Sequence, residues 1–271
     1  MMRVLQPSLS RLLRSYHLGP DHPMKIRLWT LLRWATGYPR LTMPYAESGW
    51  ISLDERDYLQ REIYVRGAYE PEVWENLVAH VAPGDIFWDV GAHVGAVSIK
   101  ALRDPRIRAC HAFEPDPVQA EALAFNLALN GNHGILHRLA LSDRSEIRAL
   151  YHGPLSNIGL SSLAKSTTDS MFSVTCRSGD ELVFGDGVSA PDLLKIDVEG
   201  WELHVLQGME RLLRERLPRA IVFEWAVDET GIPHDDAPAT YLGDFGYQVQ
   251  RIIRPDQHTE ARENFIALRQ V

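Results

Sequence analysis

Cysteine is scarce in this 271-residue chain, and its two cysteines, Cys110 and Cys176, lie far apart in the sequence. Two cysteines cannot build a disulfide framework, and neither has a second cysteine nearby for a metal site. We therefore expect reduced thiols in a cytoplasmic protein. Long hydrophobic runs are also missing. No stretch approaches the roughly 20 apolar residues of a transmembrane helix, and the first residues lack the apolar core of a signal peptide.

Positive charge is in the minority, with 28 Lys and Arg residues against 36 Asp and Glu residues and a net charge of −8. This balance argues against nucleic acid as a partner. The basic residues are nevertheless concentrated at the start, where residues 1–46 hold seven of them and a single acidic residue. That asymmetry fits weak contact with an anionic membrane surface or, as we favour, the solvated basic face of a helical segment.

Two parts of the chain are predicted to differ in architecture. Apolar spacing predicts one or two short helices within residues 1–44, which form an N-terminal helical appendage. From residue 45 to residue 271, strand-like apolar runs alternate with amphipathic helical segments, including a strand over residues 135–141 and a helix over residues 199–213. This alternation predicts an α/β domain with a mostly parallel sheet and helices on both faces. Residues 58–65 fit either a strand or a short helix.

Residues 85–99 indicate a strand, a tight glycine turn and the start of a helix. Gly91 and Gly95 let the backbone approach a ligand where a side chain would block it. The helix start then presents unpaired N–H groups to that ligand. Asp89 lies near the end of the strand, and His93 stands where a Gly-x-Gly-x-Gly loop has its middle glycine. The stretch therefore predicts a nucleotide-type ligand site.

Polar residues at the ends of later strands narrow the choice of ligand. Glu114 follows the second strand, where a carboxylate accepts hydrogen bonds from two ribose hydroxyls. Asp143 follows the third strand and is placed to accept from an adenine amino group, although an ordinary turn aspartate is an alternative. We expect both to share one rim with Asp89, Asp197 and Glu224, because ligands bind at the carboxyl ends of parallel strands. An adenosine fits this rim, so NAD and S-adenosylmethionine (SAM) both remain open.

The run Lys195-Ile-Asp-Val-Glu-Gly200 favours SAM over NAD. Alternation along a strand places Lys195 and Asp197 on the same face. Glu199 and Glu202 then fall at a helix start, where acidic side chains suit the helix dipole. A nicotinamide enzyme has no special use for such a run.

Four motifs together resemble those of the FkbM family of SAM-dependent methyltransferases. They are Asp89-Val-Gly-Ala-His-Val-Gly95, Phe113-Glu-Pro-Asp-Pro117, Ala140-Leu-Ser-Asp143, and Lys195-Ile-Asp-Val-Glu-Gly200 followed by Glu202 and Leu206-Gln-Gly208. The resemblance implies a class I, Rossmann-like methyltransferase fold whose seven-stranded sheet has an antiparallel last strand. It also implies methyl transfer from SAM, typically to a hydroxyl oxygen of a sugar, polyketide or glycolipid. Residues 1–44 lie outside the resemblance.

The resemblance also implies a set of cofactor-binding positions, which are Tyr69, Glu70, Asp89, Gly91, His93, Gly95, Glu114, Asp116, Ser142 and Asp143. The positions of the glycine loop would hold the methionine portion, and those after the second strand would hold the ribose. The positions after the third strand would flank the adenine, and the segment at residues 69–70 would close over the cofactor. We interpret the ring of His93 as loop packing rather than as a catalytic group.

Methyl transfer from a sulfonium is an in-line displacement, which positioning and a base both accelerate. Asp197 is our candidate base, and Lys195 is placed to tune it, because a nearby cation favours the carboxylate. In the alternative, Asp197 binds the SAM amino group and Lys195 pairs with Glu199 or Glu202. A Mg²⁺ ion shared by Asp197 and Glu224 is a further option, since hard cations prefer oxygen ligands, but we do not expect a metal.

Two other functions stay open on the sequence, namely a nicotinamide-dependent Rossmann oxidoreductase and a non-catalytic SAM-binding protein. The imperfect glycine fingerprint argues against the first. The expected partner is a small-molecule or glycoconjugate acceptor, with the loop over residues 156–162 as a candidate for recognising it. The sequence does not settle whether the chain forms a homo-oligomer.

Overall fold

The computed structural model describes residues 27, 40–54, 57–131, 134–151, 161–163, 171–216, 218–254 and 261–269. Apart from residue 27, the helices predicted before residue 36 lie outside the described residues, as does most of the loop over residues 156–162. Strand β1 (Leu41–Tyr45) pairs antiparallel with β2 (Gly49–Leu53). The predicted boundary after residue 44 therefore falls inside β1, and residues 41–44 belong to a strand rather than to a helical appendage.

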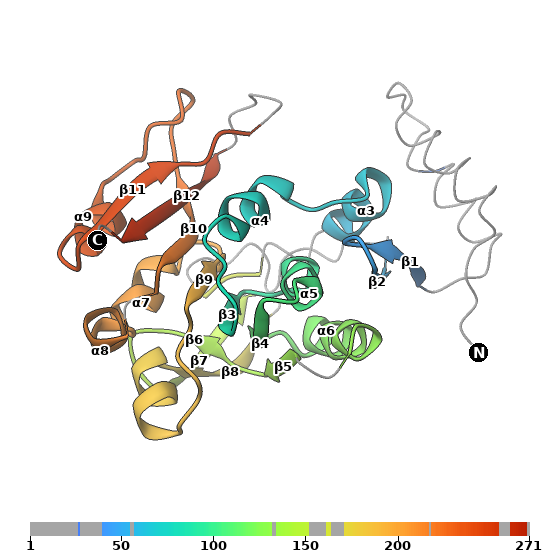
Figure 1. Cartoon of the computed structure of the whole chain (residues 1–271), viewed down its shortest axis with the longest axis horizontal. Helices are drawn as coiled ribbons and strands as arrows, with labels where there is room; N and C mark the ends of the chain where they lie inside the picture. Colours follow the sequence, from blue (N-terminus) through green and yellow to red (C-terminus); the bar gives the residue numbers. More distant parts are fainter. Residues whose placement is uncertain are drawn as a thin grey trace.

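Seven strands form the central sheet, in the order β11-β12-β10-β9-β3-β4-β5 (Figure 1). Their bounds are β3 (Asp85–Val90), β4 (Ile107–Phe113), β5 (Gly134–His137), β9 (Leu193–Ile196), β10 (Ala220–Ala226), β11 (Tyr247–Arg251) and β12 (Arg262–Arg269). Strand β12 runs antiparallel to both of its neighbours, and the other pairs are parallel. The predicted sheet is confirmed. Its strand order reverses between β3 and β9, which is where α/β folds bind ligands.

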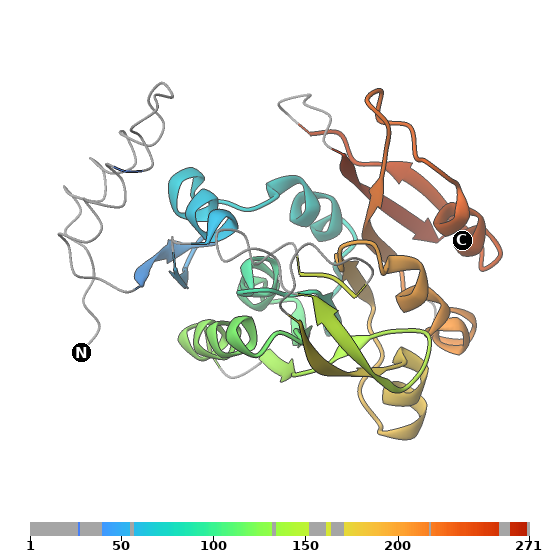
Figure 2. The same ribbon diagram turned by 180° about the vertical axis from the view of Figure 1, so that it is seen from behind.

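Helices cover both faces of this sheet, so its central strands are buried on both sides. Strand β3 is buried at every position. The helices α4 (Pro71–Val78), α5 (Ala96–Arg103) and α6 (Pro117–Leu129) pack on one face. The other face is covered by α7 (Glu202–Gln207), α8 (Glu210–Glu215), α9 (Ala237–Gly243) and a second, small sheet (Figure 2).

The small sheet has the order β6-β8-β7, with β6 (Ala140–Leu141), β7 (Glu146–Tyr151) and β8 (Met171–Arg177). The predicted strand pair near residues 146–151 and 173–176 is confirmed by β7 and β8. The single strand predicted over residues 135–141 is wrong. The chain leaves the central sheet after His137, because Ala140 and Leu141 instead join β8 and the core beneath the small sheet.

Local backbone chemistry sets two further elements. Residues 58–65 lie in helix α3 (Tyr58–Arg66), because Asp57 caps its first turn and Gly67 ends it with a φ of 79°. The helix predicted over residues 199–213 divides into α7 and α8. The break lies at Met209, whose φ of −116° is not helical and whose side chain is fully buried against Gly179. A short π-helical turn, η2 (Glu181–Gly185), precedes β9.

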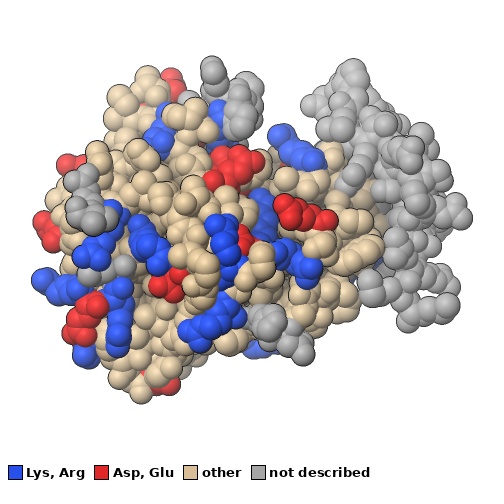
Figure 3. Space-filling model, viewed as in Figure 1, with Lys and Arg blue, Asp and Glu red and all other residues tan. Residues whose placement is uncertain are grey.

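The outer surface is mixed in charge on the face that Figure 3 shows, where basic and acidic side chains are interspersed with uncharged ones. Among the residues that the structure describes, no helix combines the length and the apolar character needed to cross a membrane.

Candidate active site

A cavity opens at the carboxyl ends of β3, β4 and β9, where the strand order reverses. Its lining brings together many of the residues predicted from the sequence, namely Tyr69, Gly91, His93, Glu114, Asp116, Lys195 and Asp197. Leu139, Ala140 and Leu141 form an apolar wall. The described residues that line the cavity do not include Glu70, Asp89, Gly95, Ser142, Asp143 or Glu224, which the sequence also placed at this site.

The glycine loop joins two strand ends. Gly91 has a φ of 76°, and a Cβ atom there would lie 1.7 Å from the carbonyl oxygen of Asp197. The close approach that requires glycine is therefore to the backbone after β9, whereas the sequence suggested a ligand. The N–H groups of Gly91 and Ala92 both donate to the carbonyl of Phe113. The loop thereby ties β3, β4 and β9 together at the floor of the cavity.

Glu114 is held from two sides by backbone donors. One oxygen accepts from the N–H of His93 and the other from the N–H of Asp116, each at 2.8 Å. Burial raises the pKa of Glu114 to about 7, although these two hydrogen bonds oppose the shift. Asp116 in turn caps α6 by accepting from Val118 and Gln119. Glu114 thus offers its remaining lone pairs in a fixed orientation.

His93 adopts a left-handed conformation with a φ of 51° and lines the cavity. Both of its ring nitrogens are buried and have no hydrogen-bond partner among the described residues. Burial lowers the pKa of His93, which favours the neutral imidazole. A buried polar group without a partner is a candidate for contact with a bound ligand or an ordered water.

Ser142 and Asp143 follow β6 in the small sheet, so they do not lie at an end of a central strand. The Ser142 hydroxyl is buried, accepts from the indole N–H of Trp201 at 3.0 Å and donates to Asp143. Asp143 also contacts Arg144. These partners occupy the side chains that the sequence assigned to the adenine, and the assignment stays a prediction.

Lys195 lies between two carboxylates. Its Nζ atom is 3.1 Å from Asp197 and 3.5 Å from Asp89, and it donates to the carbonyl of Gly91. Burial alone would lower the pKa of Lys195, but the attraction of the two carboxylates outweighs it and raises the pKa, so the cation persists. The alternative in which Lys195 pairs with Glu199 or Glu202 is wrong. Asp89 is fully buried and also accepts a hydrogen bond from the hydroxyl of Ser98.

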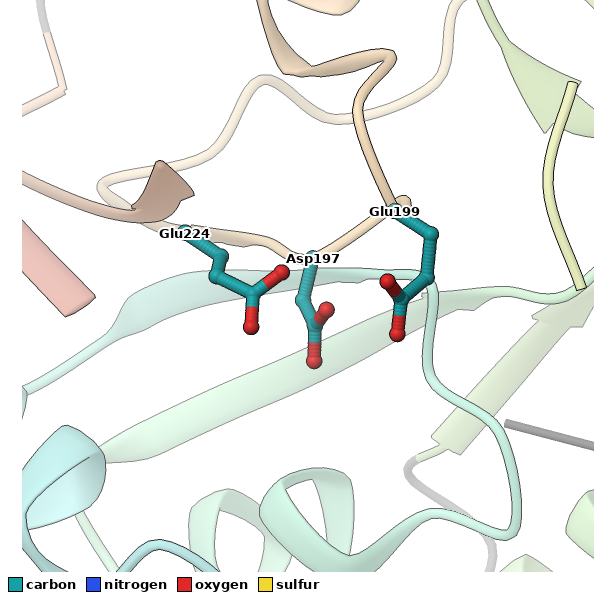
Figure 4. A group of neighbouring side chains, drawn as sticks. All are labelled: Asp197, Glu199 and Glu224. Carbon is teal, nitrogen blue, oxygen red and sulfur yellow. The ribbon is translucent and has the colours of Figure 1, made fainter. Parts of the chain in front are cut away.

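Three carboxylates converge beyond Lys195. Oxygen atoms of Asp197, Glu199 and Glu224 all lie within 4.8 Å of one another, and Figure 4 shows Asp197 between the other two. Burial and then repulsion from Asp197 raise the pKa of Glu199 to about 8 and that of Glu224 well above its ordinary value. Glu199 lies in a turn with a φ of 51° rather than in the helix predicted there.

Arg262, which the sequence analysis missed, contacts this cluster. Its Nε atom donates to Glu224 at 2.6 Å, and its terminal nitrogen donates to Glu202 at 3.1 Å. The same Nε atom lies 3.9 Å from Glu199. No local signal marks Arg262, because its position depends on the register between β10 and β12.

The segment at residues 69–70 reaches the same region. Lys100 donates to the carbonyl of Tyr69 at 3.1 Å, and Glu70 has a φ of 35° and lies 3.6 Å from Arg254. One oxygen of Glu70 is buried without a hydrogen-bond partner in the described part of the chain. Burial, together with repulsion from Asp197, raises the pKa of Glu70 to about 7.

Comparison with known proteins shows the family to which this chain belongs. A family model described as the methyltransferase FkbM domain matches residues 89–249. The chain belongs to the FkbM methyltransferase family. The matched residues run from the glycine loop through the carboxylate cluster to β11, so they contain most of the site.

Two curated relatives and one solved structure illustrate this family. The hexuronic acid methyltransferase AglP of Haloferax volcanii is 30% identical over 193 residues, which cover 70% of this chain and 77% of that protein. The 31-O-demethyl-FK506 methyltransferase FkbM of Streptomyces tacrolimicus is 29% identical over 190 residues, covering 59% and 71%. A methyltransferase FkbM from Methylobacillus flagellatus has the same fold, with a TM-score of 0.52 and 15% identity. This chain is matched over 96% of its length but spans only 58% of that solved chain.

The cavity of this FkbM-family chain fits a cofactor that carries an adenosine. Glu114 is oriented with free lone pairs, His93 has two buried nitrogens without partners, and an apolar wall lies at residues 139–141. Glu114 can accept hydrogen bonds from hydroxyl groups, His93 offers an unsatisfied polar group, and the apolar wall suits a flat base. They meet in one lining at the edge of the sheet where such ligands bind.

Proposed function

We propose that the protein transfers a methyl group from SAM to a hydroxyl oxygen of a sugar or a related small molecule. The observation that carries the proposal is a cavity that is lined both by Glu114 and by the Lys195–Asp197 ion pair. We assign Glu114 to a cofactor side of this cavity and the ion pair to an acceptor side, where the methyl group is transferred. The names of the curated relatives support an oxygen acceptor, since one is a hexuronic acid methyltransferase and another acts on a 31-O-demethyl compound.

On the cofactor side, Glu114 would accept hydrogen bonds from the ribose hydroxyls, with Asp116 beside it. The loop from Asp89 to Gly95 would hold the methionine portion, and the Tyr69–Glu70 segment would close over it. Ser142 and Asp143 would flank the adenine from behind the apolar wall. When bound, SAM supplies a methyl group made electrophilic by its sulfonium.

On the acceptor side, Asp197 would accept the proton of the attacking hydroxyl. Lys195 would keep Asp197 in place, since the two groups form an ion pair at 3.1 Å and Lys195 is buried. A positioned base of this kind contributes about 10²- to 10⁴-fold to a rate. Tyr69 lines the same cavity and helps to exclude water from the reacting atoms.

The proposal also covers the cellular compartment, the partners and the domain bounds of the enzyme. Cys110 and Cys176 are free and buried, which supports a reducing compartment such as the cytoplasm. We propose a small-molecule or glycoconjugate acceptor and no nucleic acid partner. We also propose that residues 45–271, extended backward to include β1, form the methyltransferase domain.

Calorimetry tests the cofactor assignment first. S-adenosylhomocysteine and NAD are titrated separately into the full chain. We expect S-adenosylhomocysteine to bind with one site per chain and NAD to give no heat of binding. The reverse result would overturn the proposal in favour of an oxidoreductase.

A methyl-transfer screen then tests the reaction. SAM with a radiolabelled methyl group is incubated with the protein and with methyl glycosides of glucose, glucuronic acid and glucosamine. Transfer of label to an oxygen of any of these supports the proposal. Binding of S-adenosylhomocysteine without transfer to these or to macrolide acceptors would instead favour the non-catalytic SAM-binding protein.

A further inference from the structure

Arg262 reaches the carboxylate cluster because of the antiparallel pairing at the end of the sheet. Strand β12 places Asn264 opposite Glu224 and Arg262 opposite Ala226. Alternate residues of a strand share a face, so Arg262 and Glu224 are diagonal neighbours on the same side. The guanidinium therefore lies over the end of β10, next to the turn that follows β9.

The contacts of Arg262 connect three segments. Its Nε atom contacts Glu224 at 2.6 Å and Glu199 at 3.9 Å, and a terminal nitrogen contacts Glu202 at 3.1 Å. Glu202 is fully buried, and its other oxygen accepts from the N–H groups of Val198 and Gly200. Arg262 thus holds Glu224 directly and the turn that carries Glu199 through Glu202.

The charges around the cluster show what this guanidinium does. Lys195 contacts Asp197, and Arg254 contacts Glu70 nearby. Arg262 contacts the other two carboxylates of the cluster, whose oxygen atoms come within 4.8 Å of Asp197. Repulsion from Asp197 adds to burial in raising the pKa values of Glu199 and Glu224, and the charge of Arg262 opposes this rise, so the guanidinium favours the ionised form of both carboxylates. A planar guanidinium suits several carboxylates at once, which an ammonium does less well.

We propose that Arg262 is a positioning residue that acts as the resident counter-ion of the cluster, in the place that a divalent cation would otherwise take. It holds Glu199 and Glu224 on either side of Asp197. Held in this way, the carboxylates present the acceptor hydroxyl to Asp197, a step that rests on the proposed function. The site of methyl transfer is then completed by an arginine rather than by a metal ion.

Metal binding is the first readout, because it needs neither an acceptor nor a cofactor. Mn²⁺ is titrated into the wild-type chain and into Arg262→Gln, and its binding is followed by electron paramagnetic resonance. We expect no specific site in the wild type and a gained Mn²⁺ site in Arg262→Gln, since three carboxylates without their counter-ion form a set of hard ligands. Arg262→Lys keeps the charge and should gain no site.

Catalysis is the second readout, with the acceptor that gives the highest transfer in the glycoside screen. We expect kcat to fall at least about 10-fold in Arg262→Gln and less in Arg262→Lys, while the Kd for S-adenosylhomocysteine changes by less than about threefold. Arg269→Gln, on the exposed end of the same strand, is the matched control and should change none of these values. A general loss of folding would move the Kd together with kcat.

Three results would overturn the role of Arg262. The first is a wild-type Mn²⁺ site that Glu199→Gln abolishes, the second is an unchanged kcat in Arg262→Gln, and the third is an Arg262→Gln chain that folds but gains no Mn²⁺ site. If Arg262→Gln does not fold, the double variant Arg262→Gln/Glu224→Gln removes one of the repelling charges. In that case the double variant should recover a cooperative melting transition, and a double variant that also fails to fold would contradict the proposal. Failure of S-adenosylhomocysteine to bind the wild type counts instead against the proposed function.

Discussion

The two sides of the cavity are built differently. The side that we propose for the cofactor, around Gly91 and Glu114, comes from one continuous strand–turn–helix and the strand that follows it. The side that we propose for the acceptor contains Asp197, and next to it lie Glu224 and Arg262, which come from strands that are close only through sheet pairing. A side made from local sequence is recognisable as a motif. A side made by strand register becomes visible only in three dimensions.

Asp197→Asn separates the two sides most sharply. The amide keeps the shape of the carboxylate but cannot take the hydroxyl proton, so kcat should fall by about 10²- to 10⁴-fold. Binding of S-adenosylhomocysteine should stay within about threefold, since the cofactor side is intact. Both are measured on the same preparation, by radiolabelled methyl transfer and by calorimetry. An equal loss in both would show that Asp197 binds the cofactor instead.

Gly91→Ala should damage both sides, because this glycine is where they touch. The new Cβ atom would lie 1.7 Å from the carbonyl of Asp197, at a φ of 76°. We expect a loss of at least about 3 kcal/mol in the free energy of unfolding, measured with urea. Gly67→Ala is the matched control. It has a similar φ of 79° but open space around it, so strain alone should cost about 1 kcal/mol. Equal losses would contradict the contact.

The pH dependence of cofactor binding tests the cofactor side alone. The pKa of Glu114 is raised to about 7, so the carboxylate gains a proton as the pH falls through that value. The ionised form is the better acceptor for ribose hydroxyls, and affinity for S-adenosylhomocysteine should therefore weaken below pH 7, by up to about 10-fold per pH unit. Calorimetry between pH 5.5 and 8.5 measures this slope. Glu114→Gln should flatten it, and an unchanged slope would assign it to another group.

Trp201→Phe gives the smallest expected effect. It removes the indole N–H that donates to Ser142 but keeps a ring for stacking against His204. This hydrogen bond links the turn after β9 to the chain after β6. We expect a loss of about 1 kcal/mol in stability by urea unfolding and little change in cofactor affinity. A large loss of affinity would mean that the two sides are coupled through Ser142.

The sequence predicted the fold well because its signals are local. Buried apolar runs and a glycine turn define β3, α5 and β4, and alternation alone predicts a mostly parallel sheet. The split between β5 and β6 was not predictable, since residues 135–141 form one continuous strand-like run. The break at Met209 was hidden for the same reason, because apolar spacing continues through it.

The functional site shows the same contrast, because the residues in local motifs were predictable and those brought together by strand pairing were not. Glu114, Lys195 and Asp197 stand in recognisable motifs, and the structure places all three in the cavity lining. Asp143 was assigned by counting strands and Ser142 by the family resemblance, and both lie after a strand of the other sheet. Arg262 is separated from Glu202 by 60 residues, so no spacing rule connects them. Its partners become visible only when β12 is paired with β10.

The central claim is that Glu114 anchors the adenosine of SAM in this cavity. Titration of S-adenosylhomocysteine into the wild type and Glu114→Gln at pH 8 tests it directly. The account predicts one site per chain in the wild type and an affinity at least about 10-fold weaker in Glu114→Gln, as expected for hydrogen bonds to a charged group. Equal affinity in the two proteins, with both chains folded, would contradict it.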